Sequence, residues 1–269
     1  MALAAASLVA WTGTGLAEEA GALAKSVPPV WAQAARGIGA DVSPTPDDRS
    51  FYLVWLPEGA VTFRPPVIVA LHDRGETAVD VVEAWRPYAA ERGYGLVAVQ
   101  WTAGPGASDE AVYSSENLAM VLWPILRGYD VIPGTALLYG RGAGAAHAYL
   151  LAALDRQTAD PLFKLVVADA GGIRPESPVY QDISSGRYGQ IILAGTRWVL
   201  FCGGRDPAPE RDGCPAMRRT RDWLQTYGGR IDRLIEDPAS GHDGFRRSPA
   251  HVNTVLDLFD RLMAGSPES

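Results

Sequence analysis

The sequence predicts an α/β protein in which helices cover both faces of a mostly parallel central sheet of about seven strands. Three observations support this fold class. Runs of strand-forming residues alternate with helical patterns over residues 50–264, the order that βαβ units produce. Some of these runs, such as 66–71, are continuously apolar and rich in β-branched residues, as strands buried on both faces are. An apolar run at 135–139 passes through closely spaced glycines into an alanine-rich run, which is typical of a strand, a tight turn and a helix.

Each element is justified by its own pattern. The first expected strand, residues 49–57, ends at a Pro-Glu-Gly turn, and residues 66–72 form the next strand. Residues 77–92 carry apolar side chains at helical spacing, and a Gly-Tyr-Gly sequence ends this helix. The remaining expected elements are strand 96–101, helix 115–127, strand 135–139, helix 145–154, strands 165–172 and 197–204, helix 211–227, strand 231–235 and helix 249–263.

Length and composition favour one globular domain. The chain has 269 residues, of which 47% are hydrophobic and 20% charged, enough for a substantial core. We assign the domain to residues 49–264, preceded by a proline-broken linker or N-terminal extension at 26–48 and followed by a short tail at 265–269. The formal net charge is −7 and the arginines form no basic stripe, which argues against nucleic acid as a partner.

The N-terminus resembles a secretory signal. Residues 1–25 contain a short apolar run followed by small residues that offer a cleavage site, although the basic start of a signal is missing. The apolar run is too short for a stable membrane span. We therefore expect an exported protein, periplasmic or secreted. The alternative is an apolar N-terminal helix that packs on the domain of a cytoplasmic protein.

Two cysteines, Cys202 and Cys214, are a candidate disulfide across a Gly/Pro-rich loop. Pairing is reasonable in an exported protein, whereas in the cytoplasm both would be buried thiols. Two cysteines without a nearby histidine make a metal site improbable, and we expect no metal. The mid-chain glycines read G-x-G-x-G where a dinucleotide site needs G-x-G-x-x-G, so we expect no cofactor.

The segment that organises the chain is Gly140-Arg141-Gly142-Ala143-Gly144. Its spacing resembles the nucleophile elbow G-x-S-x-G of the α/β-hydrolases, a strained turn that lifts a serine above the sheet. Glycine stands here in place of that serine. Because glycine adopts positive φ at little cost, this exchange removes the hydroxyl while keeping the turn.

Three further motifs follow expected strands: Gly203-Gly204-Arg205-Asp206, Gly241-His242-Asp243-Gly244-Phe245 and His72-Asp73-Arg74-Gly75. The order elbow, Asp206, His242 is the order Ser, Asp, His of the α/β-hydrolases. The third motif resembles their His-Gly oxyanion turn, with Asp73 in place of glycine. Over residues 50–264 the pattern is similar to small esterases of the polyhydroxybutyrate-depolymerase, feruloyl-esterase and dienelactone-hydrolase types.

The resemblance implies a role for each residue. His242 would be the general base and Asp206 would orient it, with Asp169 and Asp243 as rivals for the acid. Backbone N–H groups would form the oxyanion hole. The residues expected to supply those N–H groups are Ala143 and Arg74, and those expected to support the pocket are His72, Asp73 and Arg141.

We therefore interpret the chain as a relative of serine carboxylesterases whose activity is lost or very low, because Gly142 offers His242 no hydroxyl to activate. The expected partner is a small-molecule ester or apolar ligand. On this hypothesis Gly142→Ser alone should create esterase activity. The alternatives are a non-catalytic ligand-binding protein on the same scaffold, and a non-hydrolytic enzyme that uses His242 and Asp206 as an acid/base pair.

Overall fold

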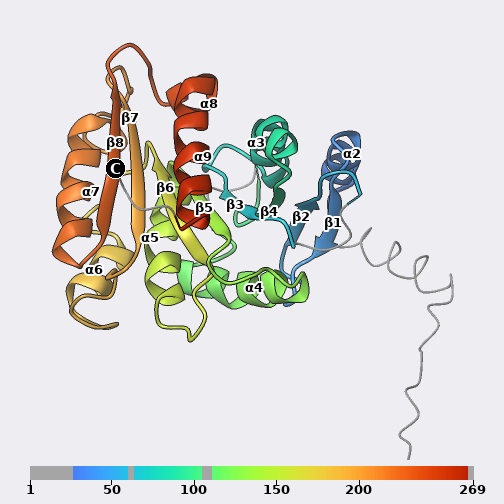
Figure 1. The fold of residues 1–269 in the computed structure, drawn as a ribbon, viewed down its shortest axis with the longest axis horizontal. Helices are drawn as coiled ribbons and strands as arrows, with labels where there is room; N and C mark the ends of the chain where they lie inside the picture. Colours follow the sequence, from blue (N-terminus) through green and yellow to red (C-terminus); the bar gives the residue numbers. More distant parts are fainter. Residues whose placement is uncertain (1–26, 60–63, 105–110, 266–269) are drawn as a thin grey trace, which may run out of the picture.

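A computed structural model describes residues 27–59, 64–104 and 111–265 of the chain (Figure 1). Its centre is an eight-stranded sheet in the order β1-β2-β4-β3-β5-β6-β7-β8. The strands are β1 (Asp41–Pro44), β2 (Phe51–Trp55), β3 (Val67–Leu71), β4 (Gly95–Val99), β5 (Ala136–Arg141), β6 (Phe163–Asp169), β7 (Arg197–Gly203) and β8 (Arg230–Asp237). The expected leader at 1–25 lies outside the described residues, as does nearly all of the tail at 265–269.

Helices cover both faces of the sheet, as expected. The described helices are α2 (Pro29–Gly37), α3 (Ala78–Arg92), α4 (Ser115–Gly128), α5 (Ala143–Asp155), α6 (Pro178–Ser184), α7 (Cys214–Thr226), α8 (Gly244–Arg247) and α9 (Pro249–Met263). One hydrophobic cluster joins α4, α5, α6 and α7 to the sheet. A second cluster joins α2, α3, α8 and α9 to its other face. None of these described helices is long and apolar enough to cross a bilayer.

The sheet has one strand more than the predicted number, at its N-terminal edge. Residues 26–48, expected to be a linker, contribute helix α2 and strand β1. β1 pairs antiparallel with β2, and the hairpin is closed by a bond from the N–H of Thr45 to the carbonyl of Ser50 (2.8 Å). The prolines in this segment prevent a long helix or strand, but they are compatible with the short helix α2 and the short strand β1.

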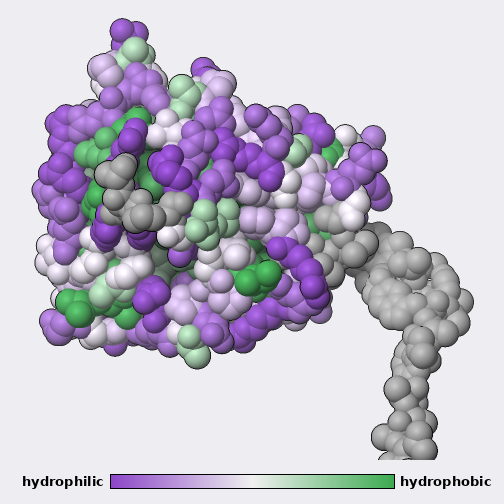
Figure 2. Space-filling view, in the orientation of Figure 1, coloured by the Kyte–Doolittle hydropathy of each residue, from purple (hydrophilic) through white to green (hydrophobic). Residues whose placement is uncertain are grey.

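The remaining pairings explain where the candidate site forms. β2 is antiparallel to β4, whereas the six strands from β4 to β8 in the sheet order are parallel to one another. Every residue of β3, β4 and β5 is buried, which accounts for the continuous apolar character of β3 and β4 and of the first part of β5. Because parallel strands end at one edge of a sheet, the loops after β3, β5, β7 and β8 come together there. The surface in Figure 2 is mostly polar, with only small hydrophobic patches.

Candidate active site

The segment predicted to be a nucleophile elbow forms a tight turn between β5 and α5. Gly142 lies between the last residue of β5 and the first of α5, with φ 52° and ψ −117°. L-residues rarely adopt this positive φ, and they hold it at a cost of about 1–3 kcal/mol. Glycine at this position therefore keeps the tight turn without strain.

The space above Gly142 is filled by a side chain from another loop. A Cβ atom added to Gly142 would overlap the carboxyl carbon and both carboxyl oxygens of Asp73, which follows β3. The Asp73 carboxylate therefore occupies the position that a serine side chain at residue 142 would take.

This carboxylate also fills the predicted oxyanion hole. Oδ1 of Asp73 accepts hydrogen bonds from the backbone N–H groups of Ala143 and Arg74, both at 2.8 Å. These are the two donors that the resemblance implied. The first residue of α5 supplies one of them, at a helix end where N–H groups are free to bind an anion.

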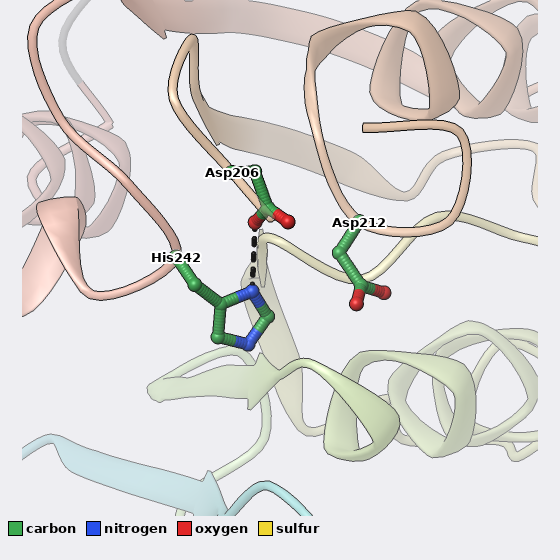
Figure 3. A group of neighbouring side chains, drawn as sticks. All are labelled: Asp206, Asp212 and His242. Carbon is green, nitrogen blue, oxygen red and sulfur yellow. Dashed lines mark hydrogen bonds and ion pairs between the residues drawn. The ribbon is translucent and has the colours of Figure 1, made fainter. Parts of the chain in front are cut away.

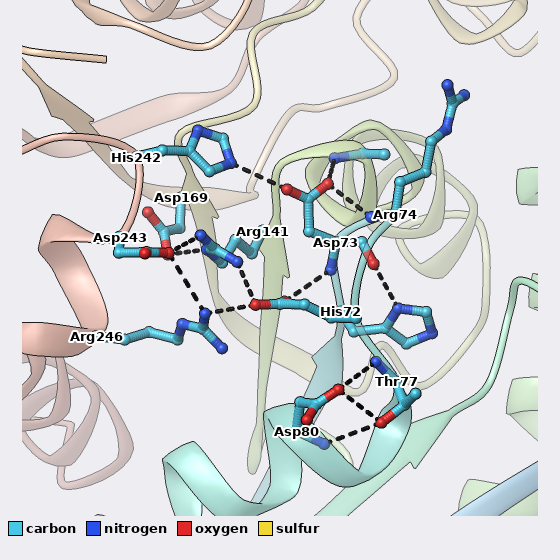
Figure 4. A network of polar contacts seen from close by, with 12 residues as sticks. His72, Asp73, Arg74, Thr77, Asp80, Arg141, Asp169, His242, Asp243 and Arg246 are labelled. Atoms are coloured by element: carbon cyan, nitrogen blue, oxygen red, sulfur yellow. Dashed lines mark hydrogen bonds and ion pairs between the residues drawn. The ribbon is translucent and has the colours of Figure 1, made fainter. Parts of the chain in front are cut away.

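The other carboxyl oxygen of Asp73 faces the predicted base (Figure 4). Asp73 Oδ2 lies 3.0 Å from Nε2 of His242, and Nδ1 of His242 lies 2.8 Å from Oδ2 of Asp206 (Figure 3). The side chain of Asp206 is fully buried, whereas those of Asp73 and His242 are each 22% exposed. We call Asp73, His242 and Asp206 the His242 triad. Solvent therefore reaches Asp73 and His242, whereas Asp206 is shielded from it.

The two carboxylates make His242 an imidazolium at neutral pH. The bond to Asp73 is the largest cause that raises the pKa of His242, to about 9; burial opposes it and the bond to Asp206 adds to it. Burial disfavours the ionised form of Asp73, but bonds from His242, Ala143 and Arg74 outweigh it and hold the pKa of Asp73 well below its usual range. Asp73 and His242 therefore form an ion pair in the resting protein.

Arg141 organises a second ionic group beneath the triad. It contacts the carboxylates of Glu76 and Asp243 and lies 4.0 Å from that of Asp169, while Arg246 lies 2.5 Å from Glu76. We call these five residues the Arg141 cluster. Because its acids come from the loops after β3 and β8 and from β6, the cluster joins the loops that carry Asp73 and His242.

The two rival acids belong to this cluster instead of facing His242. Asp169 accepts a hydrogen bond from the Tyr139 hydroxyl (2.6 Å), and burial raises its pKa to about 6. Asp243 pairs with Arg141. Among the three candidates, Asp206 is the carboxylate that contacts His242 Nδ1.

His72 supports the turn that carries Asp73. Its Nδ1 lies 2.7 Å from the backbone carbonyl of Asp73, so this nitrogen must be the donor, and its ring stacks on Trp101 with centroids 5.3 Å apart. Burial lowers the pKa of His72 to about 4, which keeps the ring neutral. A neutral, stacked ring fixes the direction in which the Asp73 backbone leaves β3.

The disulfide fixes the loop that carries the triad acid. Cys202 in β7 is bonded to Cys214 at the start of α7, 12 residues later. Asp206 lies inside this loop, and its Oδ1 accepts from the N–H of Ala208 (2.8 Å). Oδ2 is thereby aimed at His242.

A buried serine–histidine pair near the site was not expected as a pair. Oγ of Ser115 lies 2.8 Å from Nδ1 of His147, whose ring packs edge-on against Trp101 at 4.4 Å. Both residues are buried, and burial lowers the pKa of His147 to about 3. So weak a base suits a packed helix residue.

One group of possible metal ligands adjoins the triad. Ligand atoms of Asp206, Asp212 and His242 lie within 4.8 Å of one another (Figure 3). Two of these residues bond each other, and Asp212 pairs with Arg211 at 2.6 Å. Since these atoms already have partners, the grouping carries no argument for a metal.

Comparison with known proteins identifies the fold class. No protein-family model and no curated protein matches the chain. Solved structures do match, and they show that the chain has the α/β-hydrolase fold. Esterase B from Lactobacillus Rhamnosis is 16% identical with a TM-score of 0.58, covering 91% of this chain and 96% of its own. A phospholipase/carboxylesterase from Dyadobacter fermentans is 14% identical with a TM-score of 0.54, covering 77% and 95%. The acylaminoacyl peptidase of Pyrococcus horikoshii is 16% identical with a TM-score of 0.55, covering 81% and 40%.

Proposed function

We propose that this chain is a relative of serine carboxylesterases from which ordinary serine-esterase turnover has been lost. One observation carries the proposal: the Asp73 carboxylate fills the space of the missing serine side chain. Gly142 and Asp73 are thus a complementary pair of departures from the esterase pattern, one side chain lost and another gained in the same volume.

Hydrolysis of an acyl ester needs a free oxyanion hole and a free base, and Asp73 is bonded to both. The carbonyl oxygen of an ester would have to enter the oxyanion hole, but Oδ1 of Asp73 holds the N–H groups of Ala143 and Arg74. The base nitrogen of His242 is likewise bonded to Asp73 and carries a proton at neutral pH. The same bond disfavours a simple acid/base enzyme that uses His242 and Asp206 alone.

The complementary pair changes what Gly142→Ser should do. The sequence indicated that this exchange alone would create activity. The structure adds that a side chain at residue 142 collides with Asp73. We therefore expect Gly142→Ser to remain inactive and the double variant Asp73→Gly/Gly142→Ser to gain activity.

The test is hydrolysis of a short chromogenic ester by the wild type, the two single variants and the double variant. Asp73→Gly/Gly142→Ser should exceed the matched control Asp73→Gly/Gly142→Ala, which lacks only the hydroxyl, by roughly 10²–10³-fold, with a burst from the acyl-enzyme. Burst kinetics in the wild type, or a full gain from Gly142→Ser alone, would contradict the proposal.

A further inference from the structure

The hydrogen bonds of Asp73 resemble those of a reacting group more than those of a side chain that only fills space. One oxygen, Oδ1, is held by two backbone N–H groups, and the other, Oδ2, faces an imidazole that a buried acid orients. The side chain is 22% exposed, so it is in contact with solvent. A side chain that only fills space needs neither an oxygen held by two N–H groups nor an oriented base beside it.

The ionisation of Asp73 decides which chemistry it can perform. Its pKa lies well below the usual range, so the carboxylate is a poor general base near neutral pH. A nucleophile, in contrast, must be ionised when it attacks, and carboxylates form covalent intermediates in several enzyme classes. Asp73 meets the requirement that a nucleophile be ionised, while its weak basicity disfavours removal of a proton.

We propose that Asp73 is the nucleophile of a hydrolase for alkyl halides, which forms an alkyl ester that water then cleaves with His242 as base. This inference extends the proposed loss of serine-esterase turnover by assigning a chemistry to the same site.

The substrate class follows from the leaving group. If a carboxylate attacked an ester carbonyl, the tetrahedral intermediate would expel the carboxylate again, because an alkoxide is a far stronger base and a poorer leaving group. At a saturated carbon that bears a halide, the order is reversed, because halide is the weaker base and departs as a stable anion without a proton. An alkyl halide is thus the electrophile that matches an ionised carboxylate.

The first step makes one bond and breaks one bond. A lone pair on Oδ2 of Asp73 attacks the carbon, the carbon–halogen bond breaks, and halide leaves with the bonding pair. Oδ1 becomes the carbonyl oxygen of the new ester and stays in the bonds from Ala143 and Arg74. The resting geometry thus already holds the oxygen that must carry negative charge in the second step.

The second step depends on a change in His242. Alkylation removes the negative charge of Asp73, the largest cause that raises the pKa of His242, so the ring releases its proton to solvent and becomes a base. It then takes a proton from water, whose oxygen attacks the carboxyl carbon. The intermediate collapses, the bond from that carbon to the alkoxy oxygen breaks, and the alcohol leaves with the proton from His242. The net reaction converts alkyl halide and water to alcohol, halide and a proton, and one oxygen of water remains in Asp73.

The experiment uses 1-bromobutane and 1,2-dibromoethane with the full chain. His242→Gln should stop at the ester, so mass spectrometry should find one alkyl group per chain on the peptide that contains Asp73. The near-isosteric Asp73→Asn should show none, and Asp257→Asn, an exposed change on α9, should behave as the wild type. Single turnover of the wild type in H₂¹⁸O should place ¹⁸O in Asp73 and release bromide.

An unmodified Asp73 in His242→Gln with both bromides overturns the proposal. So does alkylation that persists in Asp73→Asn, or bromide release by the wild type without ¹⁸O in Asp73. The wild-type measurement keeps the test valid if His242→Gln does not fold. A gain of esterase activity in Asp73→Gly/Gly142→Ser, with Asp73 never alkylated, would overturn this inference and leave the proposed function standing. If Asp73 is alkylated and Asp73→Gly/Gly142→Ser gains no esterase activity, this inference stands and the proposed function is overturned.

Discussion

The same edge of the sheet carries two ionic groups of contrasting design. In the Arg141 cluster, the central side chain of Arg141 is 5% exposed and that of Asp169 fully buried, and several acids share two guanidinium groups. In the His242 triad, one imidazole lies between two carboxylates, and two of the three side chains are 22% exposed. A buried central arginine with shared partners suits a scaffold, although Asp243 at the edge of this cluster is 40% exposed. A titratable central ring that solvent reaches suits chemistry. Variants of the two groups should therefore differ in which property they lose, stability or proton affinity.

Removal of the central arginine should destabilise the fold severely. Arg141→Met removes the cation that lies 4.0 Å from the buried Asp169, and it leaves Glu76 and Asp243 paired only with the arginines of α8. Breaking a buried ion pair from one side costs about 3–5 kcal/mol. Chemical denaturation measures the free energy of unfolding. Arg247→Met is the matched control, because Arg247 is 80% exposed and its pair with Asp243 should contribute less than about 1 kcal/mol. Equal losses in the two variants would remove the distinction between scaffold and surface.

Removal of the disulfide should have the next largest effect. Changing both Cys202 and Cys214 to alanine should lower the free energy of unfolding by roughly 3 kcal/mol in the loop-entropy model. Because Asp206 lies within the closed loop, its bond to His242 should also loosen, which exchange of the His242 ring proton in NMR spectra can report. A reductant should have the same effect on the wild type and none on the alanine variant. A ring proton that exchanges equally slowly in both proteins would show that the loop holds Asp206 without the bridge.

The pKa of His242 should respond differently to the loss of each of its two carboxylate partners, Asp73 and Asp206. Asp73→Asn should lower the pKa of His242 from about 9 towards the ordinary 6.5, because the bond to Asp73 is the largest cause of the shift. Asp206→Asn should lower it less. NMR titration of the His242 ring measures both values. If Asp206→Asn has the larger effect, Asp73 is not the dominant partner of the ring.

The same ion pair predicts a dependence of stability on pH. The pKa of His242 is higher in the folded state than in the unfolded chain, so its contribution is fully present below about pH 6.5 and is lost as pH rises through about 9. The pKa of Asp73 is lowered instead, so its contribution is present above the ordinary carboxyl pKa and is lost in acid. The free energy of unfolding of the wild type should therefore fall between pH 6.5 and 9 relative to that of His242→Gln. Parallel curves for the two proteins would contradict an ion pair in the folded state.

Some residues of this site can be predicted from the sequence because each of them directly follows a strand. Gly142, Asp206 and His242 each follow a strand, and the strands are parallel, so chain order alone indicates that the three meet at one edge. Chain order favoured Asp206 as the partner of His242 Nδ1, but it left Asp169 and Asp243 as rivals. That choice depends on which carboxylates Arg141 neutralises, and its partners lie far apart in the sequence.

Asp73 shows what a linear pattern misses. The sequence marked both Gly142 and Asp73 as departures from the esterase motifs, yet interpreted them separately, as a lost nucleophile and a supporting residue. Their complementarity exists only in three dimensions, where the loop after β3 passes over the elbow. A signal was present, because the two departures fall in the two motifs that together form an oxyanion hole, and one adds the volume that the other removes.

A change in the buried Ser115–His147 pair should have the smallest effect. The pair provides a further comparison with the His242 triad. It places a hydroxyl and an imidazole 2.8 Å apart, as a catalytic pair would, but burial holds the pKa of His147 at about 3. Ser115→Ala should therefore cost only about 1–2 kcal/mol in the free energy of unfolding, the value of a buried hydrogen bond whose partner is left unsatisfied. It should not change alkylation of Asp73 or the titration of His242. A loss of either would mean that the chemistry of this edge extends beyond the exposed triad, because a hydroxyl that merely packs cannot alter the proton affinity of an imidazole that it does not contact.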